Sequence, residues 1–141
     1  MAGDRFNAYS AGTLPRSALN PTALHVLKTK GHDISPLHAK HINAFQTSDA
    51  PLMDFVFTVC DRAANEDCPT WAGQPISGHW GMPDPARVDG TEAQKQLAFH
   101  QTYGAFHNRI SIFCALPLDE LDRPSQQRHV DDIAKQSATK E

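Results

Sequence analysis

The stretch Leu52–Cys60, LMDFVFTVC, decides the fold of this 141-residue chain. Its apolar residues run almost without interruption, which is typical of a strand buried on both faces in a parallel sheet. A second, weaker strand is predicted over Ile76–Trp80, ended by Gly81 and the turn Pro83-Asp84-Pro85. A short strand pattern also covers Phe6–Ala11. Strands that alternate with helices predict an α/β domain with a parallel sheet.

Two pairs of residues mark helix starts between these strands. Asn20-Pro21 joins an N-cap to a proline in the first turn, and Gly31 ends the helix that follows. Ser35-Pro36 repeats the signal and predicts a second helix to about Phe45. After the central strand we expect a short helical or turn segment that reaches about Asp67.

A long amphipathic helix is predicted towards the C-terminus. Thr91 and Gln94 form a capping box at its start. The apolar face that we expect to pack against the sheet consists of Phe99, Tyr103, Phe106, Ile110 and Phe113. From Leu118 onward the chain is charged and predicts a surface helix that frays at its end. We therefore expect one domain, residues 1–141, in which residues 118–141 form a charged helical tail.

The composition is that of an ordinary globular protein. Hydrophobic residues make up 40% and charged residues 21%, which fits neither a disordered chain nor a coiled coil. The formal net charge of -3 argues against a protein that binds nucleic acid or an anionic membrane. No apolar run is long enough to span a membrane, and Met1–Arg5 lacks the apolar core of a signal peptide. Three cysteines cannot all pair, so we expect a reducing, cytoplasmic location.

Four pieces of the sequence carry a resemblance to a known family. In chain order they are Ser10-Ala11-Gly12-Thr13, Asn20-Pro21, Thr58-Val59-Cys60-Asp61 and His79-Trp80-Gly81-Met82-Pro83-Asp84-Pro85-Ala86. Together they resemble the arsenate reductases of the low-molecular-weight protein tyrosine phosphatase family. The resemblance implies a three-layer α/β fold with a parallel sheet flanked by helices and a long C-terminal helix. It also implies a thiolate-based reaction, either the reduction of arsenate or the hydrolysis of a phosphate ester. The substrate would be an arsenate or phosphate-type oxyanion, and no cofactor is expected.

In that family an anion-binding loop with the pattern Cys, five residues, Arg follows the first strand. Backbone N–H groups cradle the oxyanion, the cysteine thiolate attacks it, and the arginine binds its equatorial oxygens. In this sequence no arginine stands six positions after any cysteine, because those positions hold Glu66, Gln74 and Glu120. The resemblance places the first strand and the loop before Met1, and it implies that the 141-residue chain is inactive.

Asp84 matches the general acid of the family, which protonates the leaving oxygen. Pro83 and Pro85 restrict the backbone on both sides and would hold the carboxyl group in place. The alternative is a rigid surface turn without a catalytic role. Ser10 corresponds by resemblance to a hydroxyl that supports the anion loop, or else is an ordinary turn residue. His79 belongs to the same motif as Asp84 and is expected to pack beside the acid loop.

Cys60 and Cys68 are redox candidates by the same resemblance. Some thioredoxin-coupled relatives pass oxidising equivalents through two cysteines of this region to an internal disulfide, whereas glutaredoxin- or mycothiol-coupled relatives need no such relay. A thiol reductant of one of these systems is therefore an expected partner. The alternative is that Cys60 is a small buried side chain at a strand end and Cys68 an ordinary loop residue. Cys114 is predicted to serve packing only.

The eight histidines raise the question of a metal site. His38 and His41 are three positions apart, and His100 and His107 are seven positions apart, so each pair could share one helix face. No carboxylate or cysteine joins either pair at ligand spacing, and we therefore favour solvated helix faces and no metal.

Three functions remain open at this stage. The first is an arsenate reductase or phosphatase that lacks its nucleophile. The second is a non-catalytic binding or regulatory domain that forms a homodimer through exposed sheet edges, where Phe6–Ala11 pairs with Leu52–Cys60 or another chain completes the sheet. The third is catalysis by a new nucleophile, Cys60, with Arg62 nearby.

Overall fold

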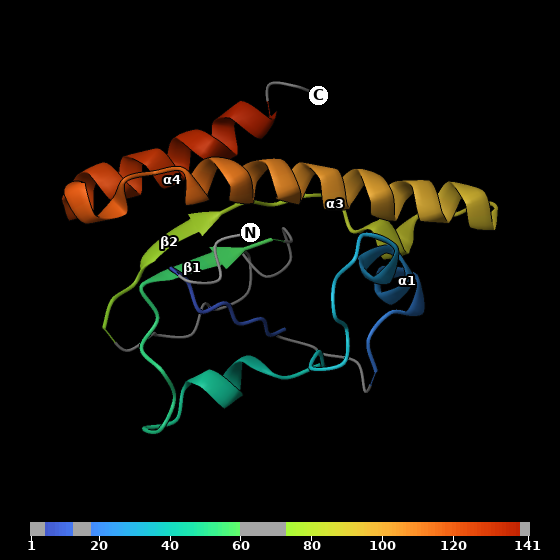
Figure 1. Cartoon of the computed structure of the whole chain (residues 1–141), viewed down its shortest axis with the longest axis horizontal. Coiled ribbons are helices and arrows are strands. Elements are labelled where there is room, and N and C mark those ends of the chain that lie inside the picture. The colour runs from blue at the N-terminus through green and yellow to red at the C-terminus, as the bar shows by residue number, and fades with distance from the viewer. Residues whose placement is uncertain (1–4, 13–17, 60–72, 139–141) are drawn as a thin grey trace. The chain divides into compact units, whose positions relative to one another are not determined.

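A computed structural model of the chain describes residues 5–12, 18–59 and 73–138 (Figure 1). The chain divides into two compact units, each described here by itself. The first unit comprises Met1–Phe6, Pro51–Pro83 and Ala105–Glu141, and the second comprises Asn7–Ala50 and Asp84–Gly104. Cys60, Cys68, Arg62 and the segment predicted to reach Asp67 lie outside the described residues.

The first unit contains the sheet that Leu52–Cys60 predicts. Strand β1, Phe55–Thr58, pairs in parallel with strand β2, Ile76–His79, and Phe55 lies opposite Ile76. The prediction of an α/β fold with a parallel sheet is therefore confirmed. The prediction that the central strand is buried on both faces is wrong, because all four residues of β1 are only half-buried. In β2, Ser77 and His79 are exposed.

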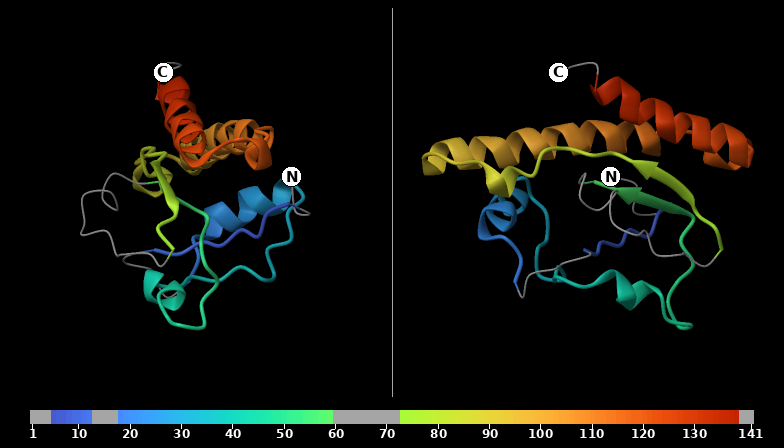
Figure 2. Two further views of the ribbon diagram at one scale, coloured as in Figure 1. Left: turned by 90° about the vertical axis from the view of Figure 1, so that its left-hand side faces the viewer. Right: turned by 180° about the vertical axis from the view of Figure 1, so that it is seen from behind.

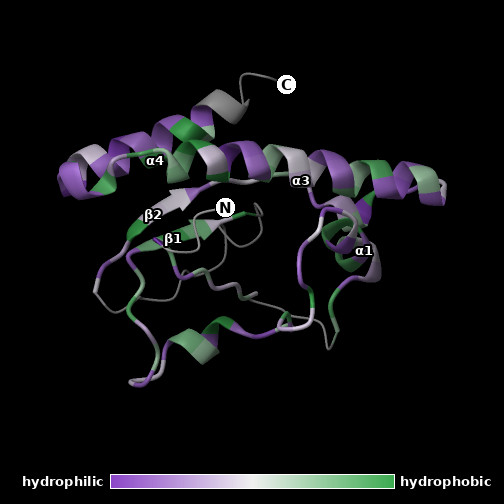
Figure 3. Ribbon diagram, viewed as in Figure 1, coloured by the Kyte–Doolittle hydropathy of each residue, from purple (hydrophilic) through white to green (hydrophobic). Residues whose placement is uncertain are grey.

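Helix α4, Arg123–Ala138, packs against β2, as two opposite views of the chain show (Figures 1 and 2). The predicted charged tail is thus helical, but it also supplies the core: Val130 is fully buried and Ile133 is 3% exposed. Most positions of α4 are hydrophilic, with a few apolar ones among them (Figure 3). These few decide the packing, because an apolar stripe on one helix face is enough to bind the helix to a sheet.

The core of the first unit gathers apolar side chains from distant parts of the sequence. Phe113, near the end of helix α3 (Glu92–Cys114), packs edge-on against Phe55 and Phe57 of β1. The buried members of this core are Ile76, Trp80, Phe113, Leu118, Val130 and Ile133. Leu118 opens the short 3-10 helix η3, Leu118–Glu120, which leads into α4.

Helix α4 begins at an aspartate cap. The Asp122 carboxylate accepts a hydrogen bond from the Ser125 N–H at 2.9 Å, which satisfies a donor at the helix start. Hydrogen bonds from the Ser125 side chain and then its backbone lower the pKa of Asp122 below its usual value. The ionised carboxylate is therefore the form that caps the helix.

In the second unit, helix α1, Pro21–Thr29, confirms the first predicted helix. The Asn20 side chain accepts from the N–H groups of Thr22 and Ala23 at 2.9 and 3.2 Å. At the other end Gly31 adopts a φ of 87°, which lets the following backbone fold back onto the helix carbonyls. The cap and stop residues thus act as the sequence predicts.

The capping box of α3 is also confirmed. The Thr91 N–H donates to Gln94 Oε1 at 2.9 Å, and the Gln94 N–H donates to Thr91 Oγ1 at 3.2 Å. The aromatic face predicted for this helix is only partly buried. Phe113 is buried, but Ile110 is 41% exposed and the remaining members are half-buried.

The predicted strand Phe6–Ala11 is wrong. These residues form no ladder, and the only pairing nearby within residues 5–12 and 18–59 is an isolated bridge between Gly12 and His41. Residues 7–11 are exposed. A strand needs a neighbouring backbone to bond, and a period-2 pattern over six residues does not provide one.

The predicted helix from Ser35 to Phe45 is also wrong. The Asp33 carboxylate accepts from both the N–H and the hydroxyl of Ser35, at 3.0 and 2.7 Å, and so builds a turn. Only a 3-10 turn, η1 (Ile42–Phe45), follows. The segment has no apolar stripe to bury, and without one a short helix is not stable.

A glycine of β2 sets how closely α4 approaches the sheet. A Cβ atom at Gly78 would collide with the Val130 side chain and lie 3.3 Å from Phe57 Cδ1. Gly78→Ala should therefore lower the free energy of unfolding by about 1–3 kcal/mol through overpacking, measured by urea denaturation. The matched control is Gly104→Ala in α3, where no atom lies within 4 Å of the new Cβ. That control should be neutral or stabilising by up to about 1 kcal/mol, and an equal loss in both variants would contradict the packing argument.

Among the described residues, no helix is both long enough and apolar enough to cross a membrane.

Candidate functional site

Ligands of open parallel sheets bind at the carboxyl ends of the strands. In the first unit this end carries Thr58 and His79, whose side chains form a hydrogen bond of 2.7 Å between Oγ1 and Nδ1. Backbone pairing continues past the strands, because the Trp80 N–H donates to the Thr58 carbonyl at 2.8 Å. The two strand ends are therefore held together, and they fix the position of His79.

A buried arginine supports the same strand end. Arg109 of α3 is 5% exposed, and its Nη1 donates to the Trp80 carbonyl at 2.6 Å. Its guanidinium also lies 5.9 Å from the centre of the Phe106 ring. Arg109 therefore anchors the chain where it leaves β2 for the acid loop. We did not predict this residue, although an arginine between Phe106 and Phe113 on an apolar face is a signal that could have identified it.

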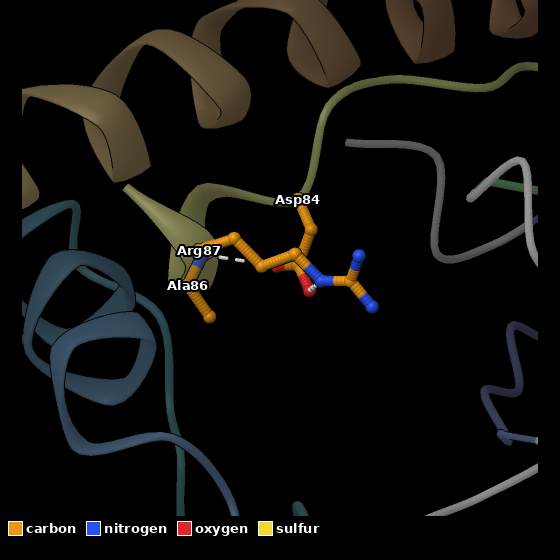
Figure 4. A network of polar contacts seen from close by, with 3 residues as sticks. All are labelled: Asp84, Ala86 and Arg87. Carbon is orange, nitrogen blue, oxygen red and sulfur yellow. Dashed lines mark hydrogen bonds and ion pairs between the residues drawn. The ribbon is translucent and has the colours of Figure 1, made fainter. Parts of the chain in front are cut away.

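Asp84 lies in the second unit, at the start of the 3-10 turn η2, Pro85–Arg87 (Figure 4). Its Oδ1 accepts a hydrogen bond from the Ala86 N–H at 2.9 Å. Its Oδ2 lies 3.7 Å from Arg87 Nε, and the Asp84 side chain is 47% exposed. An ion pair this open to water contributes little stability. The carboxyl group is thus held by its own turn while one oxygen stays accessible to solvent.

The remaining predicted site residues are placed as follows. Ser10 is exposed in the second unit. His79 belongs to the first unit and Asp84 to the second, so packing of His79 beside the acid loop stays a prediction. Cys60 and Cys68 lie outside the described residues, whereas Cys114 is a free, half-buried thiol at the end of α3.

Only one of the two histidine pairs lies on an α-helix as the spacing suggested. His38 and His41 share no α-helix, and His41 instead caps η1, where its Nδ1 accepts from the Asn43 N–H at 3.0 Å. His100 and His107 do both lie on α3. Within residues 5–12, 18–59 and 73–138 no three His, Cys, Asp or Glu side chains gather as metal ligands would.

A cavity of about 390 Å³ lies elsewhere in the first unit. Phe55 and Ile76, the first residues of the two strands, are in its wall, so it opens at the amino ends of the strands. Its charged lining residues are Arg5, Asp54, Asp119 and Arg123. Because Thr58 and His79 lie at the opposite ends of the strands, this cavity is not part of the candidate site.

The elements of the first unit define an α/β protein with polar side chains at the carboxyl ends of parallel strands. Residues 2–127 match the family model described as low molecular weight phosphotyrosine protein phosphatase. The chain belongs to this family, which confirms the resemblance that the four sequence pieces indicated.

The curated relatives of the chain include bacterial arsenate reductases. The arsenate reductase of Bacillus subtilis (strain 168) is 36% identical over 111 residues, which cover 79% of this chain and 76% of the relative. That of Oceanobacillus iheyensis is 32% identical over 113 residues, covering 80% and 78% of the two chains. Arsenate reductase 1 of Staphylococcus epidermidis is 35% identical over 96 residues, covering 67% and 68%.

Proposed function

We propose that Asp84 is the general acid of a site for arsenate or a phosphate ester. The observation that carries the proposal is the Pro83-Asp84-Pro85 turn, in which one carboxylate oxygen is fixed by the Ala86 N–H and the side chain stays 47% exposed. A general acid must be able to reach the oxygen that it protonates, and a rigid, solvent-accessible carboxyl group meets this need. The arsenate reductases among the relatives support an oxyanion as the substrate. We propose a thiol reductant as the partner and the cytoplasm as the location.

A general acid alone does not carry the reaction. The attacking group is a thiolate in a loop of converging N–H groups, with an arginine on the substrate oxygens. These 141 residues contain no Cys-x5-Arg pattern. We propose that the chain by itself neither reduces arsenate nor hydrolyses phosphate esters.

The test is the turnover of an aryl phosphate, and of arsenate with a thioredoxin, glutaredoxin or mycothiol system, by the purified chain. We expect rates equal to those of buffer, with no difference between the chain and its Asp84→Asn variant. Turnover that falls by about 10²–10⁴-fold in Asp84→Asn would refute the proposed inactivity while supporting the role of Asp84. Turnover that disappears in Cys60→Ser would instead establish Cys60 as a new nucleophile.

A second candidate function is a binding or regulatory domain that oligomerises through its sheet. The observation that favours it is the two-stranded sheet of the described residues, in which β1 is bonded along one side only. Unpaired strand edges recruit further strands. The predicted partner strand Phe6–Ala11 does not form, so an intermolecular partner is the remaining form of this proposal.

A further inference from the structure

The loop that joins η2 to α3 contains the pair Asp89-Gly90, the only aspartate followed by glycine in the sequence. In such a pair the glycine nitrogen can attack the carboxyl carbon of the aspartate, because glycine has no Cβ atom to block the approach. The reaction needs a carboxyl group that is free to rotate and an N–H group that no acceptor holds. Both conditions are set by the fold.

Asp89 meets both conditions. Asp89 and Gly90 are exposed and lie between η2 and α3, outside any helix or strand. Within residues 5–12, 18–59 and 73–138 the Asp89 carboxylate accepts no hydrogen bond and forms no ion pair, and the Gly90 N–H donates to no carbonyl. Nothing in the described structure therefore keeps these two groups apart.

Two other exposed aspartates show how the fold can prevent the same reaction. The Asp33 carboxylate accepts from the N–H and the hydroxyl of Ser35, at 3.0 and 2.7 Å, and cannot turn towards its own backbone. After Asp49 the following N–H is engaged, because Ala50 donates to the Thr47 carbonyl at 3.1 Å. Asp89 differs from both in the freedom of its carboxyl group and of the next N–H.

The backbone just after Asp89 lies tightly against the start of α3. Gly90 has a φ of 140°, which favours glycine, and a Cβ atom at this position would collide with the Gln94 side chain. Gln94 Oε1 is the atom that accepts from the Thr91 N–H in the capping box of α3. An extra backbone atom before Gly90 would therefore displace this cap.

We propose that Asp89 is a site of spontaneous isomerisation to isoaspartate, an inference that goes beyond the proposed function. The Gly90 nitrogen forms a bond to the Asp89 Cγ atom, the bond from Cγ to its hydroxyl oxygen breaks, and this hydroxyl leaves with the N–H proton as water. A succinimide ring results.

Water then opens the ring at one of its two carbonyl groups. Attack at Cγ restores aspartate, whereas attack at the main-chain carbonyl of Asp89 breaks its bond to the Gly90 nitrogen and leaves the backbone running through the side chain. One water is released and one is consumed, so the step needs no oxidant or other reactant. The product has the same mass and still carries one carboxylate, but its backbone is longer by one carbon atom.

The experiment ages the purified chain in neutral buffer at physiological temperature and follows one tryptic peptide. Trypsin cleaves after Arg87 and Lys95, so the peptide 88–95 contains Asp89 as its only aspartate. We expect a second chromatographic peak of the same mass that grows with time, together with a form that is lighter by one water molecule. A protease that cuts before aspartate should cleave the first peak and leave the second intact. The absence of a second peak would overturn the proposal.

Two variants separate the effect of the fold from that of the dipeptide. Asp89→Glu keeps the charge but would have to close a larger ring, so the second peak should disappear. Ile34→Gly places a glycine after Asp33, whose carboxylate Ser35 holds. The peptide 31–40 of this variant should therefore isomerise at least about tenfold more slowly than 88–95 in the folded chain, and at a similar rate in urea. Equal rates at both sites in the folded chain, or isomerisation of Asp89 only in urea, would contradict the inference.

Urea unfolding of the aged chain measures the consequence for α3. Loss of the cap should raise the equilibrium constant for unfolding by about two- to thirtyfold in the isoaspartate form. Aged Asp89→Glu should unfold as the fresh variant does. An isoaspartate form as stable as the fresh chain would refute the displacement of the cap and leave the modification site itself supported.

Discussion

Trp80→Ala is expected to lower the free energy of unfolding by about 3–5 kcal/mol. The Trp80 side chain is 3% exposed and stacks on Phe57 with ring centroids 3.9 Å apart. It also meets Phe113 edge-on, and its Nε1 donates to the Val130 carbonyl of α4 at 3.2 Å. Truncation therefore leaves a large cavity between the sheet and two helices and removes a buried hydrogen bond.

Urea unfolding followed by circular dichroism measures this loss, and two controls separate its causes. Trp80→Phe keeps an aromatic ring but removes the N–H donor, so the smaller loss expected, about 1–2 kcal/mol, reports mainly on the hydrogen bond. Tyr9→Ala removes an aromatic side chain that is 51% exposed and should change stability by less than about 0.5 kcal/mol. A Trp80→Ala variant as stable as Tyr9→Ala would show that Trp80 is not part of the core.

Val130→Asp is expected to be at least as damaging, with a loss of about 4 kcal/mol or more at neutral pH. Val130 is fully buried and meets β2 at Gly78, where even an added Cβ atom would collide with its side chain. A buried carboxyl group has a raised pKa because burial disfavours its charged form. The loss should therefore be smaller at acidic pH, where the group is protonated, than at pH 7.

The matched control for Val130→Asp is Asp132→Asn, which changes an exposed residue two positions away on the same helix. It should alter stability by less than about 0.5 kcal/mol. If Val130→Asp does not fold at all, Val130→Thr keeps the shape and buries only a hydroxyl group, with an expected loss of about 1–3 kcal/mol. Equal stability of the Val130 and Asp132 variants would mean that α4 is a solvated tail after all.

Local signals in the sequence predicted those elements whose hydrogen bonds or apolar runs span only a few residues. Asn20 caps α1, Thr91 and Gln94 cap α3, and the two strands lie within the apolar runs Leu52–Cys60 and Ile76–Trp80. The failures are Phe6–Ala11 and Ser35–Phe45. Both predictions rested on short local signals, and propensity alone does not hold a strand or a short helix.

The candidate site was predicted less completely than the fold. Asp84 was identified from its motif, and the structure adds the turn that fixes one carboxylate oxygen to the Ala86 N–H. Arg109 was not identified, because its role depends on a contact with the Trp80 carbonyl, 29 positions away in the sequence. The sequence places Arg109 on the apolar face of α3, but the carbonyl that it binds is fixed only by packing.

The sequence by itself determined the family, the α/β class, the parallel pairing of two apolar strands and the lack of a Cys-x5-Arg pattern. These properties depend on residue identity and short-range spacing. Only the tertiary structure decided that α4 builds the core and covers the edge of β2. The physical reason is that burial and edge pairing are set by which surfaces meet, and a charged helix with two well-placed apolar residues can meet a sheet as closely as a hydrophobic one.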